Sequence, residues 1–330
     1  MDNFLRDKKM KNIVLIGASN SRVPGGLQAG LDQDDVKFFN LSVGGTGSLY
    51  GVYAVNRYYS ILEQADLIIL ENHMIDHILI TDCDAEIDVI FRDIFWLYES
   101  ISKFKKKVLI LFLPETRSQS MFYEKIKHIT LYLCNLYGFN FIDIYKYMKI
   151  RNILDFYLSY PNSNHQINTI MYNLGINISK NIKYLRNSKI SSKYPIPNFS
   201  IWYPNTDQQF FNKDLIYREK VCIISDKKEY FPSEYADCVL LGIHTWTGGY
   251  YKELRNKKIS KNLWNVYSYS SLKIQNCNQC IVKCFWTYNT FTNIYQRKFM
   301  VDSNTYFCFN KEQLPWSEKT LHLQKIEGLN

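Results

Sequence analysis

A serine stands in a short segment of small residues near the start of the chain, Gly17-Ala18-Ser19-Asn20-Ser21. It follows an apolar run that reads as a buried strand, and ligands of open parallel sheets bind outside the carboxyl ends of the strands. Small residues allow a sharp turn there, which would present the hydroxyl of Ser19 to the crevice. The same pattern also suits a turn with a serine that caps a helix. Taken alone, the segment leaves both interpretations open.

A glycine-rich segment, Gly44-Gly45-Thr46-Gly47-Ser48, follows the next strand-like stretch. Such a turn into a helix can direct backbone N–H groups at a negative charge, whether a phosphate or an oxyanion. The segment has no Lys-Ser or Lys-Thr after its glycines, and the first strand is not followed by G-x-G-x-x-G. An oxyanion hole is therefore favoured over a nucleotide site, which stays a weaker alternative.

One of the six histidines, His165, lies in a loop between the last predicted strand and a long helical stretch. Such a loop lies on the surface and can reach the crevice at the ends of the strands. A lone loop histidine is usually just solvated. Its place in a matched set with Ser19 makes it the candidate general base.

The elements that must position these residues alternate between strands and helices up to about residue 186, which indicates βαβ units and a parallel sheet. The apolar runs are nearly continuous, as in strands buried on both faces. The expected strands are 12–16, 36–41, 66–70, 108–113 and 139–144, and the expected helices are 47–64, 84–104, 118–137 and 166–186.

A change of pattern follows. Residues 187–199 contain serines and Pro195-Ile196-Pro197 and read as a linker. After it, runs rich in β formers predict an all-β, sandwich-like domain over residues 200–330. Within it Trp246, Tyr250 and Tyr251 lie beside glycines and are candidates for carbohydrate recognition, although core packing explains such aromatic residues more simply.

Together these blocks resemble the SGNH (GDSL-type) hydrolase superfamily over about residues 11–186, in both order and spacing. The resemblance implies a three-layer α/β domain, residues 1–186, with Ser19 as nucleophile and His165 as base. It further implies that Gly45 serves as an oxyanion donor and that Asn162 takes the position of the residue that orients His165. Asn72 would supply a second donor only with a remodelled loop after the third strand.

The sequence departs from the family pattern in three blocks. Ala18 stands where the first block has Asp, and matching Asp76 to the third block puts Ile75 at the position of its Asn. In the last block Asn162 takes the place of Asp, and an amide orients an imidazole without stabilising its charge. Asp155 is the nearby carboxylate that would replace it.

By resemblance, the expected activity is serine-dependent acyl transfer on O-acetyl groups of a carbohydrate, by an esterase or by an O-acetyltransferase of bacterial polysaccharide biosynthesis. Hydrolysis requires no cofactor, and acetyl-CoA is the possible acyl donor for transfer. The alternative is a degenerate SGNH-like domain that binds a glycan or a protein without catalysis, which the three departures favour. The sequence does not identify a CoA site, the acceptor sugar or the oligomeric state.

Composition excludes several other classes. The net charge is +9, but the lysines are scattered, so no nucleic-acid partner is expected. No transmembrane segment or secretory signal is evident, and eight cysteines suit free thiols in a cytoplasmic protein. His73 and His77 with Glu71 and Asp76 mimic a metal set but lack H-E-x-x-H spacing, so no metal is expected.

Overall fold

The structure is a computed structural model of the 330-residue chain. It describes residues 10–83, 87–115, 120–159 and 165–189, and then 196, 199–202, 209–213, 218–225, 240–245, 279–287 and 306–308. Described residues up to Ile80 and from Asp88 to Lys189 belong to one compact unit, and the described residues from 196 onward belong to a second.

The first unit is built on a five-stranded parallel sheet in the order β2-β1-β3-β4-β5. The predicted α/β architecture with a parallel sheet is confirmed. All five predicted strands are present, and no end shifts by more than one residue: β1 Lys11–Gly17, β2 Val36–Asn40, β3 Leu67–Glu71, β4 Lys107–Phe112 and β5 Asn140–Asp143.

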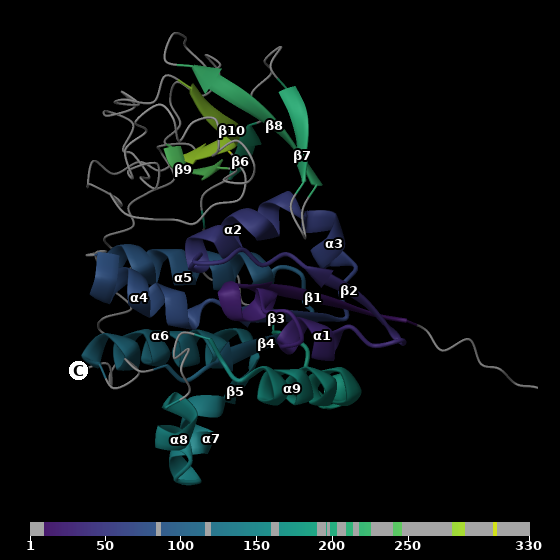
Figure 1. Ribbon diagram of the computed structural model, residues 1–330, viewed down its shortest axis with the longest axis vertical. Coiled ribbons are helices and arrows are strands. Elements are labelled where there is room, and N and C mark those ends of the chain that lie inside the picture. Colours follow the sequence, from purple (N-terminus) through teal and green to yellow (C-terminus); the bar gives the residue numbers. More distant parts are fainter. Residues whose placement is uncertain are drawn as a thin grey trace, which may run out of the picture. The chain divides into compact units, whose positions relative to one another are not determined.

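Helices cover both faces of the sheet (Figure 1). The predicted long helices are present, except that the stretch 47–64 divides at Tyr58 into two helices. These are α2 Ser48–Arg57, α3 Tyr59–Glu63, α5 Ile87–Ser102, α6 Met121–Tyr137 and α9 Asn168–Asn181.

Four further α-helices were not predicted. Three have only five to seven residues, less than two turns, and are too short to give a clear helical periodicity. The fourth, α4, starts right after β3, outside the ranges of the expected helices. The four are α1 Leu27–Leu31, α4 His73–Cys83, α7 Ile144–Ile150 and α8 Leu154–Leu158.

Alternate residues of the strands divide the core into two layers. Ile13, Leu15 and Leu109 pack with apolar side chains of α1, α6, α7, α8 and α9. The opposite face carries α2 and α5, where Gly51 of α2 lies against Leu97 of α5. Figure 1 shows α2 and α5 on one side of the sheet and α6 and α9 on the other, which is the predicted three-layer arrangement.

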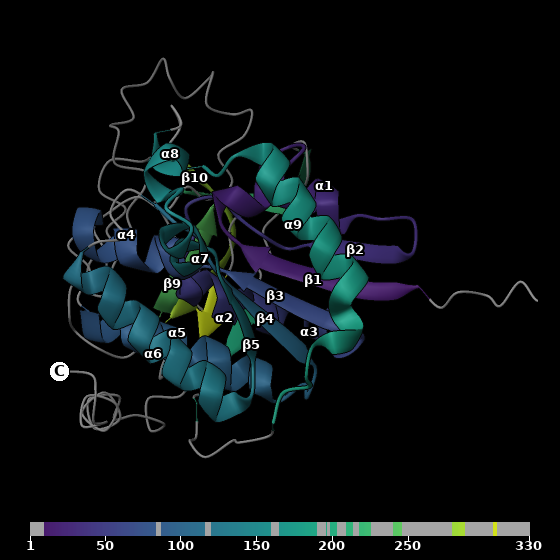
Figure 2. The same ribbon diagram turned by 90° about the horizontal axis from the view of Figure 1, so that it is seen from below.

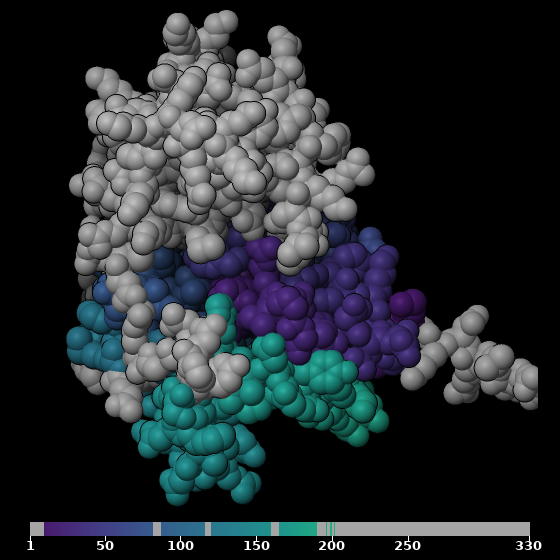
Figure 3. Space-filling model, in the orientation of Figure 1, coloured from purple at the N-terminus to yellow at the C-terminus, as the bar shows by residue number. Residues whose placement is uncertain are grey.

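Helices α1 and α9 cross at two glycines. A Cβ atom on Gly30 would lie 2.0 Å from the carbonyl oxygen of Tyr172, and one on Gly175 would lie 2.7 Å from the carbonyl carbon of Gly30. Figure 2 shows α9 beside α1 and in front of β1, and in Figure 3 the teal surface of α9 adjoins the purple surface of the first strands and α1. Backbones this close require glycine.

The described strands of the second unit are hydrogen-bonded into one mixed sheet. Its path is β11-β6-β10-β8-β7, and β9 pairs with β10. The strands are β6 Ser200–Trp202, β7 Gln209–Lys213, β8 Arg218–Ser225, β9 Leu240–Thr245, β10 Gln279–Thr287 and β11 Tyr306–Cys308. A sandwich needs a second packed sheet, so that part of the prediction stays a prediction, as does the linker.

Trp246, Tyr250 and Tyr251 lie outside the described residues. Within the part of the chain that the structure describes, no helix is both long and apolar enough to cross a bilayer.

Candidate active site

Ser19 begins a short 3-10 helix, Ser19–Arg22, directly after β1, and it is half-buried. The turn is held from beneath by Glu71, whose Oε2 accepts hydrogen bonds from the N–H of Ala18 at 3.1 Å and from the hydroxyl of Ser21 at 2.9 Å. A Cβ atom on Gly17 would lie 2.2 Å from the Ser21 hydroxyl oxygen. Glycine at this position therefore lets the chain fold back and leaves Ser19 at the end of the strand.

The place of Ser19 in the sheet is the usual place for a ligand. In the strand order β2-β1-β3-β4-β5 the connections leave β1 and β3 toward opposite sides, and this topology predicts a crevice outside their carboxyl ends. Ser19 follows β1, and Asn72 follows β3 at the same edge. The crevice that topology predicts thus has a serine on one side and an amide on the other.

The glycine-rich loop after β2 lies against Ser19. The N–H of Val43 donates to the carbonyl oxygen of Gly17 at 3.1 Å, and a Cβ atom on Gly44 would lie 3.8 Å from the Cβ of Ser19. Gly45 has a positive φ of 72°, which favours glycine. The predicted oxyanion donor Gly45 therefore lies in the loop next to the serine. Its neighbour Gly44 is the glycine of this loop that lies against the Ser19 side chain.

Asn72 and Asp76 hold the end of this loop. The side-chain amide of Asn72 donates to the carbonyl oxygen of Gly47 at 3.3 Å. The carboxylate of Asp76 accepts the N–H of Ser48 at 2.7 Å and its hydroxyl at 2.6 Å, and so caps α2 from a different helix. Ile75, which takes the position of the block's Asn, is apolar and buried, so Asn72 is the residue that brings a side-chain amide to the loop.

His165 is half-buried, and its segment is tied to the serine turn through the next residue. The N–H of Gln166 donates to Oδ1 of Asn20, which follows Ser19, at 2.9 Å. The side chain of Gln166 donates to the carbonyl oxygen of Pro114 at 2.7 Å and accepts the hydroxyl of Tyr157 at 2.6 Å. One buried glutamine thus joins the His165 segment to the serine turn, the end of β4 and α8.

The predicted partner of His165, Asn162, lies outside the described residues. The other suggestion, Asp155, is exposed on the first turn of α8.

Two buried carboxyl groups next to the serine turn and the glycine loop, Glu71 and Asp76, have raised pKa values. Desolvation raises the pKa of Glu71 to about 7, although hydrogen bonds from Ser21 and Ala18 oppose the shift. Desolvation likewise raises the pKa of Asp76 to about 7, against the hydrogen bonds from Ser48. Both groups take up protons more readily in the folded chain than in the unfolded chain.

We expect the folded protein to be more stable at pH 5 than at pH 8. Glu71 has a pKa of 4.5 when unfolded and about 7 when folded, so the stability from its protonated form is lost as pH rises through that window. Its part in the free energy of unfolding is on the order of 1–3 kcal/mol. Thermal unfolding between pH 5 and 8 measures the effect.

The variant Glu71→Gln carries a permanently neutral side chain of the same shape and should reduce this pH dependence, while Asp76 still contributes a part of the same sign. The matched control is Glu63→Gln, because Glu63 is exposed at the end of α3. A pH dependence that persists unchanged in Glu71→Gln would contradict the assignment.

His73 and His77 are both buried in α4, and the surroundings of His73 are aromatic. The ring of His73 meets those of Phe112 and Tyr123 edge-on, with centroids 4.7 and 4.8 Å away. Desolvation lowers its pKa to about 3. Across the described residues no group of three His, Cys, Asp or Glu side chains is placed to hold a metal ion.

The sequence patterns missed Glu71 and Gln166 as positioning residues of this site. Glu71 was visible as a carboxyl group at the end of an otherwise apolar strand, which is a costly place for a charge. Gln166 gave no such signal beyond its position next to His165.

The α/β unit places the predicted residues in the order that the resemblance implies: the serine follows β1, the glycine loop follows β2, the asparagine follows β3, and the histidine precedes helix α9. No protein-family model matches the chain, and no curated protein matches it either.

Solved structures that resemble the chain include a lipase/acylhydrolase from Enterococcus faecalis, 19% identical, with a TM-score of 0.44 over 55% of this chain and 100% of that one. Others are the lipase Lip_vut3 from a goat rumen metagenome (16%, TM-score 0.40, covering 54% and 99%) and the acetyl xylan esterase AlAXEase (13%, TM-score 0.42, covering 50% and 96%). At these values the similarity describes about half of the chain and says nothing of its substrate.

Proposed function

We propose that the α/β unit is a serine-dependent acyl-transfer enzyme that acts on carboxylic esters. The observation that carries the proposal is the hydrogen bond between Asn20 and Gln166, the residues that follow Ser19 and His165. It ties the candidate nucleophile to the candidate base across 146 residues of sequence, at the edge of the sheet where ligands bind.

In this mechanism the hydroxyl of Ser19 attacks the acyl carbon while His165 takes its proton. The backbone N–H groups of Ser19 and Gly45 stabilise the oxyanion, with the side-chain amide of Asn72 as a third donor. The proton on His165 then passes to the departing oxygen, and the acyl group remains on Ser19 until water or an acceptor hydroxyl removes it. Asn162 orients the imidazole.

The substrate we propose is an O-acetyl group on a carbohydrate, and both directions share the same acyl-serine. An esterase releases acetate from an acetylated sugar in buffer alone. A transferase instead moves acetyl from acetyl-CoA to a sugar hydroxyl and releases free CoA in proportion to acetylated product. Measuring acetate and free CoA with and without a sugar acceptor separates the two.

The competing function is binding of a glycan or protein without turnover. Ala18 favours it, since its side chain is apolar and fully buried where the family has an acid. A phosphonate that reacts with activated serines distinguishes the two: an adduct on Ser19 supports catalysis, and a chain that binds an acetylated glycan but never forms the adduct supports the binding module.

We further propose that the second unit contributes to substrate selection through Trp246, Tyr250 and Tyr251. The variant Trp246→Ala should then raise the apparent KM for the natural glycan roughly ten-fold, because an aromatic ring stacked on a sugar is lost. Turnover of a small acetyl ester should not change. Equal loss of both activities together with a lower melting temperature would instead identify Trp246 as a packing residue.

A further inference from the structure

After strand β4, a second serine is hydrogen-bonded to a histidine, and the other ring nitrogen of that histidine lies beside a carboxylate. The hydroxyl oxygen of Ser120 is 2.6 Å from Nε2 of His77, and Nδ1 of the same ring is 2.8 Å from a carboxylate oxygen of Glu115. His77 comes from α4, Glu115 from the segment after β4, and Ser120 from the start of α6. Three separate segments therefore converge on one contact.

The order of the contacts assigns the protons. A carboxylate beside Nδ1 keeps the ring proton on that nitrogen, which leaves the lone pair of Nε2 to accept the hydroxyl proton of Ser120. Tyr123 fixes the ring plane further, since its own ring meets that of His77 at 88° with centroids 5.7 Å apart. This is the arrangement of nucleophile, base and orienting acid that activates a hydroxyl.

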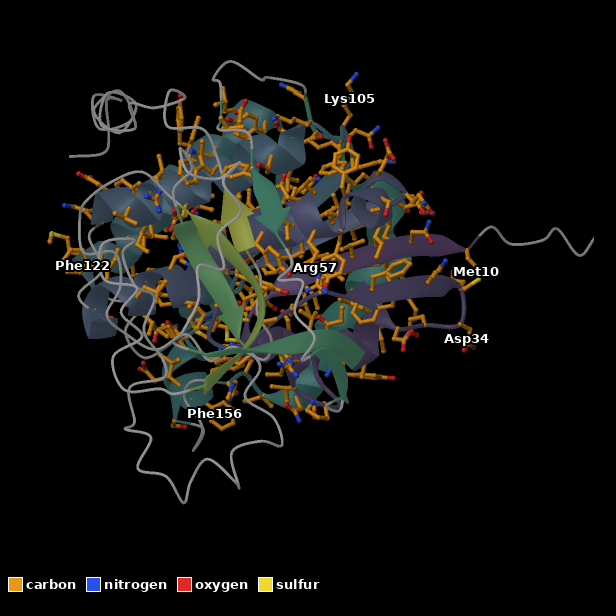
Figure 4. The ribbon with its side chains drawn as sticks, turned by 90° about the horizontal axis from the view of Figure 1, so that it is seen from above. Met10, Asp34, Arg57, Lys105, Phe122 and Phe156 are labelled. Carbon is orange, nitrogen blue, oxygen red and sulfur yellow. The ribbon has the colours of Figure 1, made fainter. Side chains whose placement is uncertain are left out.

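Exposure is graded along the three residues. His77 and Glu115 are 0% and 1% exposed, so their contact is shielded from water. Ser120 is half-buried, and the next residue, Met121, is 62% exposed. In Figure 4, Phe122 of the same helical turn lies at the edge of the unit. The serine is thus at the surface end of a buried relay.

Capping of α6 does not account for this arrangement. The hydroxyl oxygen of Ser120 accepts a hydrogen bond from the N–H of Tyr123 at 3.1 Å. This one hydrogen bond is all that a helix N-cap requires. A cap requires no imidazole and no carboxylate behind it, and burial of that pair is costly. The first N–H groups of any helix also lack partners within the helix, so those of Met121 and Phe122 are the donors that the proposal assigns to a developing oxyanion.

The geometry points to a second nucleophilic serine centre, Ser120–His77–Glu115, which accepts acyl groups from small carboxylic esters with good leaving groups. Ser120 Oγ bonds to the acyl carbon as its proton moves to His77 Nε2. The ester C–O bond then breaks, and the leaving oxygen takes that proton. Water attacks the acyl-Ser120 ester with His77 as base, which releases the carboxylic acid and restores the hydroxyl.

The test uses the full chain carrying Ser19→Ala, treated with a small alkyl fluorophosphonate, and mass spectrometry of its peptides. We expect one adduct, on Ser120. Ser159 is the internal comparison: it is exposed, its hydroxyl donates to the carbonyl oxygen of Phe156 at 2.7 Å, and within the described ranges it has no hydrogen bond to a histidine. Selective labelling of Ser120 over this more exposed serine supports the proposal, and absence of an adduct on Ser120 overturns it.

A second variant tests the relay itself. Glu115→Gln keeps the shape of the side chain but removes its charge, so labelling of Ser120 should slow at least ten-fold. Labelling at an unchanged rate would overturn the relay. If this variant does not fold, as judged by circular dichroism, the comparison of Ser120 with Ser159 in the Ser19→Ala chain still decides.

Turnover gives an independent measurement. Release of p-nitrophenol from p-nitrophenyl acetate should fall at least ten-fold when Ser120→Asn is added to Ser19→Ala, because asparagine still caps a helix but is no nucleophile. An unchanged rate would show that Ser120 does not turn over esters. Ser19 and Ser120 lie on different tryptic peptides, so an absent Ser19 adduct in the wild type would count against the proposed function alone.

Discussion

Replacing Ser19 by alanine should lower kcat/KM for acetate release from an acetylated sugar at least about a thousand-fold. The side chain lost is the proposed nucleophile, and the hydroxyl is otherwise not needed for the fold, because the turn is held by Glu71 through Ala18 and Ser21. The melting temperature should therefore stay close to that of the wild type. Steady-state kinetics and thermal unfolding of the same preparations measure both quantities.

Ser21→Ala is the matched control, since it removes a hydroxyl two residues away in the same turn. Ser21 is fully buried and bonds to Glu71, so its loss should loosen the turn and lower activity by less than about ten-fold. If Ser19→Ala and Ser21→Ala lose activity equally, the shape of the turn matters and Ser19 is no nucleophile. If Ser19→Ala keeps full activity, Ser19 is outside the mechanism.

The sheet was predictable from sequence because its strands are buried on both faces. All four residues of the β3 run are less than 3% exposed: Leu67, Ile68, Ile69 and Leu70. Because both faces of such a strand are buried, its sequence is an uninterrupted apolar run. Helix α4 was not predictable in the same way. Its polar residues His73, Asp76 and His77 suggest a loop, yet they are buried because each meets a group far away in sequence.

The residues of the candidate site likewise fall into those that a local sequence pattern predicts and those that it does not. Ser19 and the glycine loop carry a local signal, since sharp turns restrict the residue types that fit. The residues that position them act through partners that no local pattern encodes: Glu71 reaches Ser21, and Gln166 reaches Asn20. The contact between Ser120 and His77 was missed for this reason too, because it joins residues 43 apart in sequence.

The largest effect on stability should come from Gly30→Ala. The new methyl group would lie 2.0 Å from the carbonyl oxygen of Tyr172, and 2.8 Å and 3.0 Å from the carbon and Cα of the same residue. These are backbone atoms of α9, so no side chain can rotate away and the helices must move apart. We expect the free energy of unfolding to fall by about 3 kcal/mol or more, measured by urea or thermal unfolding.

Activity should fall with it even below the melting temperature. Helix α1 follows the Ser19 turn and α9 follows His165, so their crossing sets how the two segments meet. Asn177→Ala is the control, because Asn177 is exposed on α9 and alanine there adds no volume at the crossing. It should change the free energy of unfolding by no more than about 0.5 kcal/mol and leave kcat within about two-fold of the wild type.

A Gly30→Ala chain with unchanged stability would refute the close crossing of α1 and α9. A destabilised chain with full activity at low temperature would show that the crossing does not position Ser19 and His165.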